Sequence, residues 1–262
     1  MTVVLRGKCA LITGSVQGLG LAAARKFADA GCDIVLNGFA TTETVGALRR
    51  DLEEQGRVRT MYSGADLRKP EDIEQMMSEV EQLFGSIDIL INNAVVRHAA
   101  PVEQFPAEEW DQALAVNLSA AFHTIRLALP GMRRRSWGRI INVSSVYGLF
   151  ATTNRIGYVT TKTALLGLTR AVALETAGQD ITCNAVCPGT APTPVHEARI
   201  REMMTEGLSQ QDAERRFLAG KQPTGRFIAA ENVAALMMFL CGPEGRDITG
   251  AALPVDGGWS AQ

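Results

Sequence analysis

The chain has little of several features that would mark other classes of protein. No apolar run approaches the roughly 20 residues that a membrane-spanning helix needs. The formal net charge is only -2, which argues against nucleic-acid and membrane-surface partners. The N-terminus has no basic segment followed by an apolar one, and the 5 cysteines are an odd number without framework spacing. We therefore expect a cytoplasmic protein with free thiols, no membrane contact and no nucleic-acid partner.

Histidine is also scarce, and His98, His123 and His196 show no metal-ligand spacing, so no metal site is predicted. What the chain does contain is ordinary for a globular protein, with 46% hydrophobic and 21% charged residues among 262. Short apolar strands alternate with amphipathic helices, without a repeat or a linker. The pattern predicts one α/β domain over residues 1–262, a doubly wound Rossmann fold with a parallel sheet of about seven strands and helices on both faces.

Apolar runs and helix signals set the expected elements. Expected strands cover residues 8–13, 32–37, 58–64, 87–92, 140–143, 180–187 and 251–255. Expected helices cover residues 19–30, 42–55, 107–132, 157–173 and 231–241, and a further helix opens at Pro70. Residues 190–227 are charged and helical in parts, and we interpret them as a mobile cover over the substrate site.

A glycine-rich turn follows the first strand. It reads Gly14-Ser-Val-Gln-Gly18-Leu-Gly20 and leads directly into a helix. In a dinucleotide site, Gly14 permits the tight turn, Gly18 lets the backbone approach the pyrophosphate, and Gly20 allows the helix to pack closely on the strand. The helix N-terminus adds free N–H groups and a positive dipole end. A glycine triplet alone is weak evidence, but the strand before it and the helix after it supply the confirming context.

The end of the second strand indicates which cofactor is used. The acidic residue that often binds the adenosine ribose near this point is missing after Asn37. No Arg or Lys stands at Ser15, Val16, Gly38 or Phe39 to receive a 2′-phosphate. The sequence therefore favours NAD over NADP.

Two roles are open for Asp66, which follows the third expected strand. Its carboxylate can accept a hydrogen bond from an adenine amino group, or it can cap a helix or a turn. For a loop aspartate taken on its own, the second role is the commoner one.

Tyr158 and Lys162 are four residues apart on one expected helix, so their side chains share a face. A nearby ammonium group stabilises a phenolate, and a tyrosine tuned in this way can exchange a proton with an alcohol or carbonyl oxygen near neutral pH. Ser145 adds a hydroxyl if the end of the strand at residues 140–143 faces this helix. The alternative is an ordinary amphipathic helix with a surface tyrosine and lysine, because the Tyr-x-x-x-Lys spacing is common.

Taken together, these residues resemble the short-chain dehydrogenase/reductase family over essentially the whole chain. The match comprises Thr13 and the glycine turn, Asp66, the Asn92-Asn93-Ala94 run, Asn117, Ser145, Tyr158, Lys162 and Pro188-Gly189. The resemblance implies a catalytic set in which Tyr158 is acid and base, Lys162 tunes it and binds ribose, Ser145 holds the substrate oxygen, and Asn117 anchors a water-linked proton path. The implied cofactor-binding residues are Gly14, Ser15, Gln17, Gly18, Leu19, Gly20, Phe39, Asp66, Leu67, Asn93, Tyr158, Lys162, Pro188, Gly189 and Thr193.

Several segments look like the 3-hydroxybutyrate dehydrogenase branch of that family, which uses NAD and is typically tetrameric. They are residues 36–39, 100–105, 127–132, 220–223, 239–241 and 256–262. The resemblance implies a homotetramer in which the helices near residues 107–132 and 157–177 pair across a two-fold axis.

The substrate ligands of that branch differ in this chain. Where the branch binds a carboxylate with two Gln, one His and one Lys, this chain has Arg97, Arg199, Tyr147 and Arg155. A branch tryptophan is replaced by Thr190, and a branch glycine by Val95. The predicted substrate-binding residues are therefore Arg97, Ser145, Tyr147, Arg155, Thr190 and Arg199.

A planar guanidinium suits a carboxylate or a phosphate, so these residues predict a small anionic hydroxy or keto acid as substrate. Extra positive charge favours an anion bulkier or more highly charged than 3-hydroxybutyrate, such as a hydroxy dicarboxylate or a hydroxy acid bearing a sulfonate or phosphonate. Each arginine taken singly could equally be a solvated surface charge.

Other functions remain open beside an NAD-dependent dehydrogenase of an anionic hydroxy acid. The chain could be a D-3-hydroxybutyrate dehydrogenase itself, or a 3-oxoacyl-carrier-protein reductase, which would prefer NADP. A different class is an NAD-sensing binding protein on the same fold, which fold alone does not exclude. A sensor needs no proton-transfer group, and the presence of Ser145, Tyr158 and Lys162 speaks against it.

Overall fold

Seven strands form one parallel sheet in the computed structural model, which describes residues 5–262. The strands are β1 (Cys9–Ile12), β2 (Asp33–Asn37), β3 (Thr60–Ser63), β4 (Ile89–Asn92), β5 (Trp137–Val143), β6 (Asp180–Pro188) and β7 (Ala252–Val255). Their order across the sheet is β3-β2-β1-β4-β5-β6-β7, with every neighbouring pair parallel. The predicted doubly wound Rossmann fold is confirmed. The predicted domain starts at Met1, and residues 1–4 lie outside the described part.

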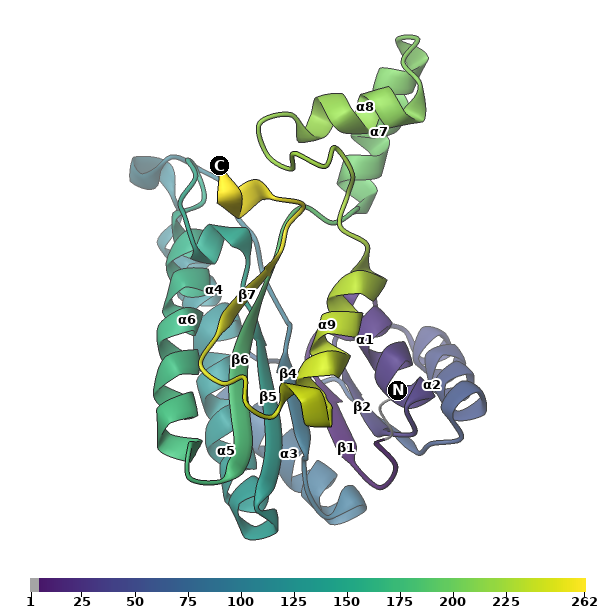
Figure 1. Cartoon of the computed structure of the whole chain (residues 1–262), viewed down its shortest axis with the longest axis vertical. Coiled ribbons are helices and arrows are strands. Elements are labelled where there is room, and N and C mark those ends of the chain that lie inside the picture. Colours follow the sequence, from purple (N-terminus) through teal and green to yellow (C-terminus); the bar gives the residue numbers. More distant parts are fainter. Residues whose placement is uncertain (1–4) are drawn as a thin grey trace.

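Helices cover both faces of the sheet (Figure 1). On one face lie α1 (Gly18–Asp29), α2 (Thr42–Gly56) and α9 (Ala230–Cys241), and on the other lie α3 (Pro70–Phe84), α4 (Ala107–Leu114), α5 (Ala120–Arg135) and α6 (Ile156–Thr176). In β1, Ala10 and Ile12 belong to the core on the α1 face, while Cys9 and Leu11 belong to the core on the α3 face. Because both faces are buried, the strands are unbroken apolar runs, which is why they stand out in the sequence.

The strand order reverses at β1 and β4. The chain runs outward from β1 to β2 and β3, and then returns to pair β4 with the other side of β1. In open α/β sheets, ligands bind in the crevice outside the carboxyl ends of the strands at such a reversal. The fold therefore directs attention to the loops that follow β1 and β4.

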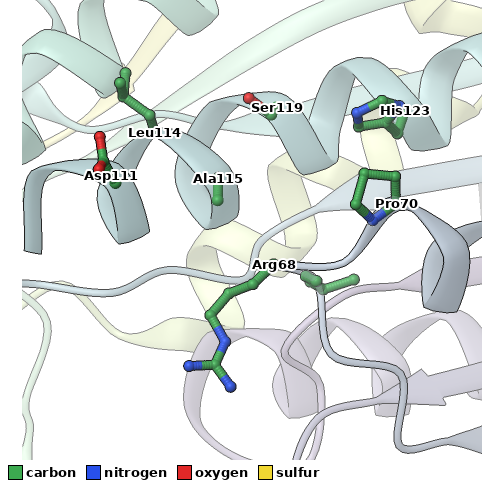
Figure 2. A pocket seen from close by; sticks show the side chains of 8 residues that line it. Arg68, Pro70, Asp111, Leu114, Ala115, Ser119 and His123 are labelled. Atoms are coloured by element: carbon green, nitrogen blue, oxygen red, sulfur yellow. The ribbon is translucent and has the colours of Figure 1, made fainter. Parts of the chain in front are cut away.

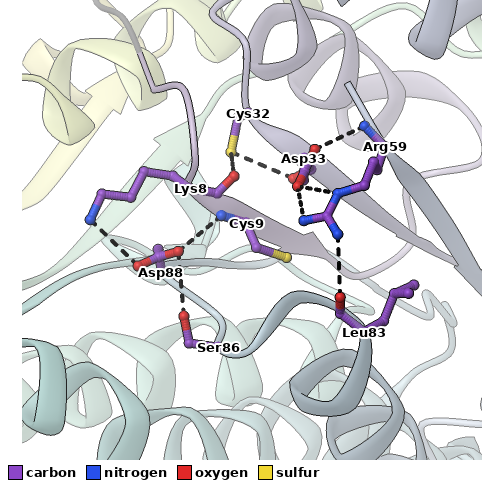
Figure 3. Close-up of polar contacts among 8 residues, drawn as sticks. All are labelled: Lys8, Cys9, Cys32, Asp33, Arg59, Leu83, Ser86 and Asp88. Carbon is purple, nitrogen blue, oxygen red and sulfur yellow. Dashed lines mark hydrogen bonds and ion pairs between the residues drawn. The ribbon is translucent and has the colours of Figure 1, made fainter. Parts of the chain in front are cut away.

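Charged side chains hold the opposite, amino edge of the sheet together (Figure 3). The buried Asp88 carboxylate accepts a hydrogen bond from the Cys9 backbone N–H at 3.0 Å and pairs with Lys8 at 3.5 Å. It also pairs with Arg135 at 3.3 Å. Burial raises the pKa of the Cys9 thiol, and the neighbouring Asp88 carboxylate adds to the effect. This edge is thus occupied by structural contacts, which leaves the carboxyl edge for a ligand.

The helix expected at residues 107–132 contains an irregularity that the sequence did not indicate. It is helical throughout and extends to Arg135, but a π-helical turn, Ala115–Ser119, separates α4 from α5. Asn117 lies in this turn and its side chain bonds both backbone groups of Val96, in the segment after β4. The expected helix is therefore present, with a π-helical turn at the place where Asn117 pairs with Val96. Turns of this kind are frequent at functional sites.

Two further helices, α7 (Pro194–Thr205) and α8 (Gln210–Leu218), project from the end of the molecule at which the C-terminus also lies (Figure 1). We call them the α7–α8 hairpin. Its buried residues Ile200, Met203 and Ala213 form a cluster with the partly buried Phe217 and Phe227, separate from the two cores beside the sheet. The hairpin therefore has its own packing and does not depend on the sheet for it.

No helix within residues 5–262 combines the length and the apolar character needed to cross a membrane.

Candidate active site

The turn between β1 and α1 has the geometry predicted for a dinucleotide site. Gly14 (φ +62°) lies so close to the loop after β4 that an added Cβ would be 2.9 Å from the Cα of Ala94. Gly20 is packed more tightly, since its Cβ would be 2.3 Å from the carbonyl oxygen of Gly14. Gly18 (φ +55°) has no atom within 4 Å of an added Cβ, so its backbone borders open space. Gln17, the N-cap of α1, makes no side-chain cap, so the first N–H groups of α1 are available to an anion.

Buried polar side chains support this turn from within. The Ser15 hydroxyl donates to the carbonyl oxygen of Ile12 at 2.7 Å and accepts from the N–H of Asn37 at 3.0 Å. Asn93 donates from its amide to the carbonyl oxygens of Thr13 (2.9 Å) and Gly14 (2.8 Å). Ser15 is completely buried, so its side chain shapes the turn from within, and its place among the cofactor-binding residues stays a prediction.

The predicted adenosine side brings Phe39, Asp66 and Leu67 near the carboxyl ends of β2 and β3. Phe39 is 72% exposed, whereas Leu67 is buried in the core. Asp66 forms an ion pair with Arg68, and hydrogen bonds from Arg68 lower the pKa of the Asp66 carboxyl. Arg68, directly after Leu67, is a cation on this side whose pairing with Asp66 has no local sequence signal.

A cavity of about 300 Å³ lies beside this segment, between the loop after β3 and the α4–α5 helices (Figure 2). Its lining residues are Leu67, Arg68, Pro70, Asp111, Leu114, Ala115, Ser119 and His123. Because Ser145, Tyr158 and Lys162 are not among them, the cavity is distinct from the candidate catalytic group.

The end of β5, which Ser145 follows, packs against the first turns of α6, which carry Tyr158 and Lys162. Gly148 permits this approach, since a Cβ there would be 2.3 Å from Oγ of Ser144 and 2.8 Å from the Lys162 carbonyl oxygen. Ser144 donates to that carbonyl at 2.7 Å, which joins the strand end to the helix. The condition attached to Ser145, that its strand end should face the helix, is thus met.

Ser145, Lys162 and Tyr158 differ in their hydrogen bonds and in their burial. Ser145 Oγ accepts from the N–H of Tyr147 at 3.1 Å, which leaves its own proton free to be donated to a substrate oxygen. Lys162 is 2% exposed and donates from Nζ to the Val143 carbonyl oxygen at 2.6 Å. Its Nζ lies 5.8 Å from the centre of the Tyr158 ring. Tyr158 is only partly buried.

Burial, and then the charge of Arg97, lower the pKa of Lys162 to about 7, while the nearby Cys187 acts in the opposite direction. Desolvation disfavours the ammonium form, and a second cation nearby disfavours it further. Lys162 therefore changes its charge close to neutral pH.

Asn117 links the segment after β4 to α6. Its Oδ1 accepts from the N–H of Val96 at 2.8 Å, and its Nδ2 donates to the carbonyl oxygen of Val96 at 3.1 Å and to Thr161 at 3.3 Å. The side chain is 2% exposed, so it acts here as a fixed brace next to Arg97.

Two of the predicted substrate residues lie against Tyr158. The Arg97 guanidinium carbon is 5.5 Å from the centre of the Tyr158 ring, and the Tyr147 ring centre is 6.4 Å from it in an edge-to-face arrangement. Trp259, which was not predicted as a site residue, packs on Tyr147 with ring centres 5.4 Å apart. In the sequence, only the Gly-Gly-Trp ending pointed to Trp259. No local pattern predicts which part of the fold a C-terminal segment packs against.

The remaining predicted substrate residues are placed less closely. Arg155 is the N-cap of α6, three residues before Tyr158, and is partly exposed. Thr190 donates its N–H to the side chain of Gln222. Arg199 lies on the α7–α8 hairpin and forms an ion pair with Glu202 on its own helix. The predicted role of Arg199 at the substrate stays a prediction.

The segment after β6 joins the sheet to the hairpin. Gly189 donates its N–H to the Val255 carbonyl oxygen at 3.0 Å, and a Cβ there would be 2.7 Å from Oε1 of Gln222. The Thr193 hydroxyl caps α7 by accepting from the N–H of His196 at 3.3 Å, so its own proton remains free for a ligand carbonyl. The residues 5–262 hold no group of three or more His, Cys, Asp or Glu side chains arranged for a metal ion.

Comparison with known proteins identifies the family. A family model described as Enoyl-(Acyl carrier protein) reductase matches residues 14–260. D-beta-hydroxybutyrate dehydrogenase of Cupriavidus necator is 42% identical over 261 residues, which cover 99% of this chain and 100% of the relative. The chain belongs to the short-chain dehydrogenase/reductase family. This short-chain dehydrogenase/reductase is also 43% identical to D-beta-hydroxybutyrate dehydrogenase of Rhizobium meliloti, covering 97% of this chain and 99% of the relative.

Among solved structures, L-sorbose reductase of Gluconobacter frateurii, complexed with NADPH and L-sorbose, superposes with a TM-score of 0.92 at 30% identity, covering 100% of both chains. This short-chain dehydrogenase/reductase is therefore an oxidoreductase of a family that uses nicotinamide cofactors, and the 3-hydroxybutyrate dehydrogenases are similar to it over nearly their full length.

Proposed function

We propose that the protein interconverts the secondary alcohol and the ketone of a small anionic hydroxy acid with NAD as cofactor. The observation that carries this proposal is the partly exposed Tyr158 beside the buried Lys162 cation and the free proton of Ser145. Bound NAD would accept hydride at nicotinamide C4 from the alcohol carbon. Tyr158 removes the hydroxyl proton, Ser145 holds the oxygen with a hydrogen bond, and Lys162 stabilises the phenolate when it is protonated.

The residues at the carboxyl edge fit a dinucleotide. The open space above Gly18 and the uncapped N–H groups of α1 suit a pyrophosphate. The remaining cofactor contacts would come from Gln17, Leu19, Phe39, Asp66, Leu67, Asn93, Pro188, Gly189 and Thr193, as implied by the family resemblance.

NAD rather than NADP is favoured by the charges on the adenosine side. No cation follows β2 at Gly38 or Phe39, and the guanidinium of Arg68 is already paired with Asp66. A 2′-phosphate placed there would lose its hydration without gaining a partner. Equal or better kcat/KM with NADP would contradict this choice.

The anionic substrate is favoured by Arg97, which lies against Tyr158, and by Arg155 at the start of the same helix. We propose a substrate bulkier or more highly charged than 3-hydroxybutyrate, with 3-hydroxybutyrate itself as the runner-up because of the two dehydrogenase relatives. The α7–α8 hairpin, with its flanking residues over about 190–227, would close over the substrate and bring Arg199 with it.

We also propose a homotetramer that works in a reducing, cytoplasmic compartment. All 5 cysteines are buried free thiols, which such a compartment preserves. Phe122 on α5 and Leu174 on α6 are exposed apolar side chains, 49% and 80% exposed, on helices expected to pair across a two-fold axis.

The deciding experiment is a screen of hydroxy acids with NAD, in which NADH absorbance is recorded. The set should hold 3-hydroxybutyrate, hydroxy dicarboxylates, hydroxy sulfonates and neutral secondary alcohols. We expect turnover with an anionic member and little with the neutral alcohols. Activity only with neutral alcohols would contradict the proposal.

A 3-oxoacyl-carrier-protein reductase is the second candidate, since such a reductase from Aquifex aeolicus is 33% identical over 98% of this chain. Oxidation of NADPH by a 3-oxoacyl thioester, faster than NADH formation from any hydroxy acid, would favour that reading.

A further inference from the structure

Two cations of different character flank the Tyr158 ring. The Arg97 guanidinium carbon lies 5.5 Å from the ring centre and Nζ of Lys162 lies 5.8 Å from it. Arg97 is exposed and Lys162 is buried. Among the ion pairs formed within residues 5–262, none involves Arg97. An exposed, unpaired guanidinium beside the candidate acid/base is a site for an external anion.

Few groups other than Arg97 influence the charge of Lys162. On its own helix the titratable neighbour is Tyr158, and from β6 it is the Cys187 thiol. Asp256, after β7, acts on Cys187 rather than on the lysine. The Nζ group has one protein acceptor, the Val143 carbonyl oxygen. No buried carboxylate therefore holds Lys162 in the ammonium form. A change in the net charge at Arg97 can consequently change the protonation of Lys162.

We propose that the anionic group of the substrate binds at Arg97 and, by neutralising the guanidinium beside Tyr158, causes Lys162 to take up a proton. The inference rests on the proposed function and deepens it, because it makes the anion of the substrate a condition for the chemistry as well as for binding. A neutral alcohol of the same shape would leave Lys162 uncharged above neutral pH, and Tyr158 would then lack the cation that stabilises its phenolate.

The direction of the effect follows from the charges. The positive charge of Arg97 lowers the pKa of Lys162, so an anion at Arg97 raises it. Starting from a pKa of about 7, Lys162 is mostly uncharged at pH 7.5, so a raised pKa means a net uptake of protons at that pH. Uptake must vanish at a pH well below 7, where Lys162 is already protonated.

The test measures protons and not turnover. Malonate is titrated calorimetrically into the cofactor-free protein at pH 7.5, in phosphate and in Tris, two buffers with different ionisation enthalpies. We expect the binding enthalpy to depend on the buffer, with a slope that corresponds to a net uptake of protons on binding. Equal enthalpies in both buffers, or no binding of malonate at millimolar concentration, would overturn the proposal.

Variants test whether Arg97 binds the anion and Lys162 takes up the proton. Lys162→Met should bind malonate without proton uptake, and Arg97→Gln should bind it more weakly and without uptake. Arg97→Lys, which keeps the charge, should restore the uptake, while Arg50→Gln, an exposed arginine on α2, should behave as the wild type. Unchanged uptake in either Lys162→Met or Arg97→Gln would refute the coupling.

The two proposals can fail separately. If hydroxy acids yield NADH but malonate binds without proton uptake, only the coupling is wrong. If proton uptake is observed but no hydroxy acid is oxidised, the proposed substrate class is wrong and the anion site remains.

Discussion

Tyr158 is the residue on which the proposed chemistry depends, and three side chains surround its ring. Its ring contacts the exposed Arg97 on one side, Tyr147 at its edge, and the buried Lys162 one helical turn along α6. Only the last of these follows from a local pattern, since residues four apart share a helix face.

Replacing Tyr158 by Phe keeps the ring but removes the transferable proton. We expect kcat to fall by at least about 10²-fold, the usual loss when a general acid–base group is removed. NAD binding, followed by protein fluorescence, should remain. Tyr62→Phe is a matched control, because the Tyr62 hydroxyl only donates to the Gly38 carbonyl oxygen at 2.8 Å. Near-normal turnover of Tyr158→Phe would show that another group moves the proton.

Lys162 should make stability depend on pH in an identifiable way. Its pKa is about 7 in the folded protein and near its usual 10.5 when unfolded, so between these values the unfolded chain binds more protons. The free energy of unfolding must therefore rise with pH through this range, and the cost of burying the ammonium is complete below pH 7.

The comparison with Lys162→Met isolates this effect. We expect the stability of wild type relative to the variant to increase between pH 6.5 and pH 9 by an amount on the order of a few kcal/mol, measured by urea unfolding. The buried thiols, for example Cys183 with a pKa raised to about 12, change stability in the opposite direction, but equally in both proteins. A pH-independent difference would show that Lys162 keeps its charge throughout.

Sequence patterns located the candidate catalytic residues but not their surroundings. The Tyr158–Lys162 spacing and the glycine turn are local, so they could be predicted. The contact of Arg97 with Tyr158 depends on an irregular loop after β4, and the burial of Ser15 depends on Asn37 from a neighbouring strand. Both contacts join residues far apart in the chain, so neither produces a periodic pattern in the sequence.

Among the elements, the strands and the extent of the helix carrying Asn117 were predicted well, but the π-helical turn in that helix was not. Strands buried on both faces are unbroken apolar runs, whereas the π-helical turn at Ala115–Ser119 leaves the helical pattern almost unchanged. Within this turn, Asn117 bonds Val96, which lies 21 positions earlier in the chain. The turn moves Asn117 out of the regular helical ladder and lets it brace the loop that carries Arg97.

The α7–α8 hairpin is joined to the sheet through Gln222. This residue is 2% exposed, accepts from the N–H of Thr190 and donates to the Arg226 carbonyl oxygen at 2.6 Å. In Gln222→Met both backbone groups lose their partner, at a cost of about 1 kcal/mol per hydrogen bond. If the hairpin closes over the substrate, KM for the hydroxy acid should rise about tenfold.

The Kd for NAD should change less than KM in Gln222→Met, because Gln222 borders the predicted cofactor segment at Gly189 and Thr190 but is not part of the glycine turn. Gln210→Met, on the exposed start of α8, is the control and should leave KM unchanged. A change of the same size in both variants would indicate a general loosening of the hairpin.

At the scale of the whole molecule, the sheet order explains why the amino edge carries stabilising contacts and the carboxyl edge carries the loops of the predicted site. The Asp88 contacts hold the amino edge, while the loops after β1, β4, β5 and β6 all open on the carboxyl edge. The strand alternation and the glycine turn were sufficient to predict this arrangement, since parallel strands with helices on both faces place every such loop on one side.

The proposed tetramer is testable through the exposed apolar side chains of α5 and α6. Light scattering at micromolar concentration should give the mass of four chains for the wild type. Phe122→Glu combined with Leu174→Glu should reduce the mass, because each carboxylate would be desolvated at a helix pairing. A monomer mass for the wild type would contradict the assembly.

The separate packing of the α7–α8 hairpin has a consequence for how such a protein can change. A hairpin whose buried residues contact one another can be exchanged for that of a relative as a module, with its two junctions near Thr193 and Arg226 kept. Such an exchange would leave the cofactor turn and Tyr158 unchanged and would alter only the substrate specificity that depends on the hairpin. Evolution could then change substrate specificity without changing the cofactor site.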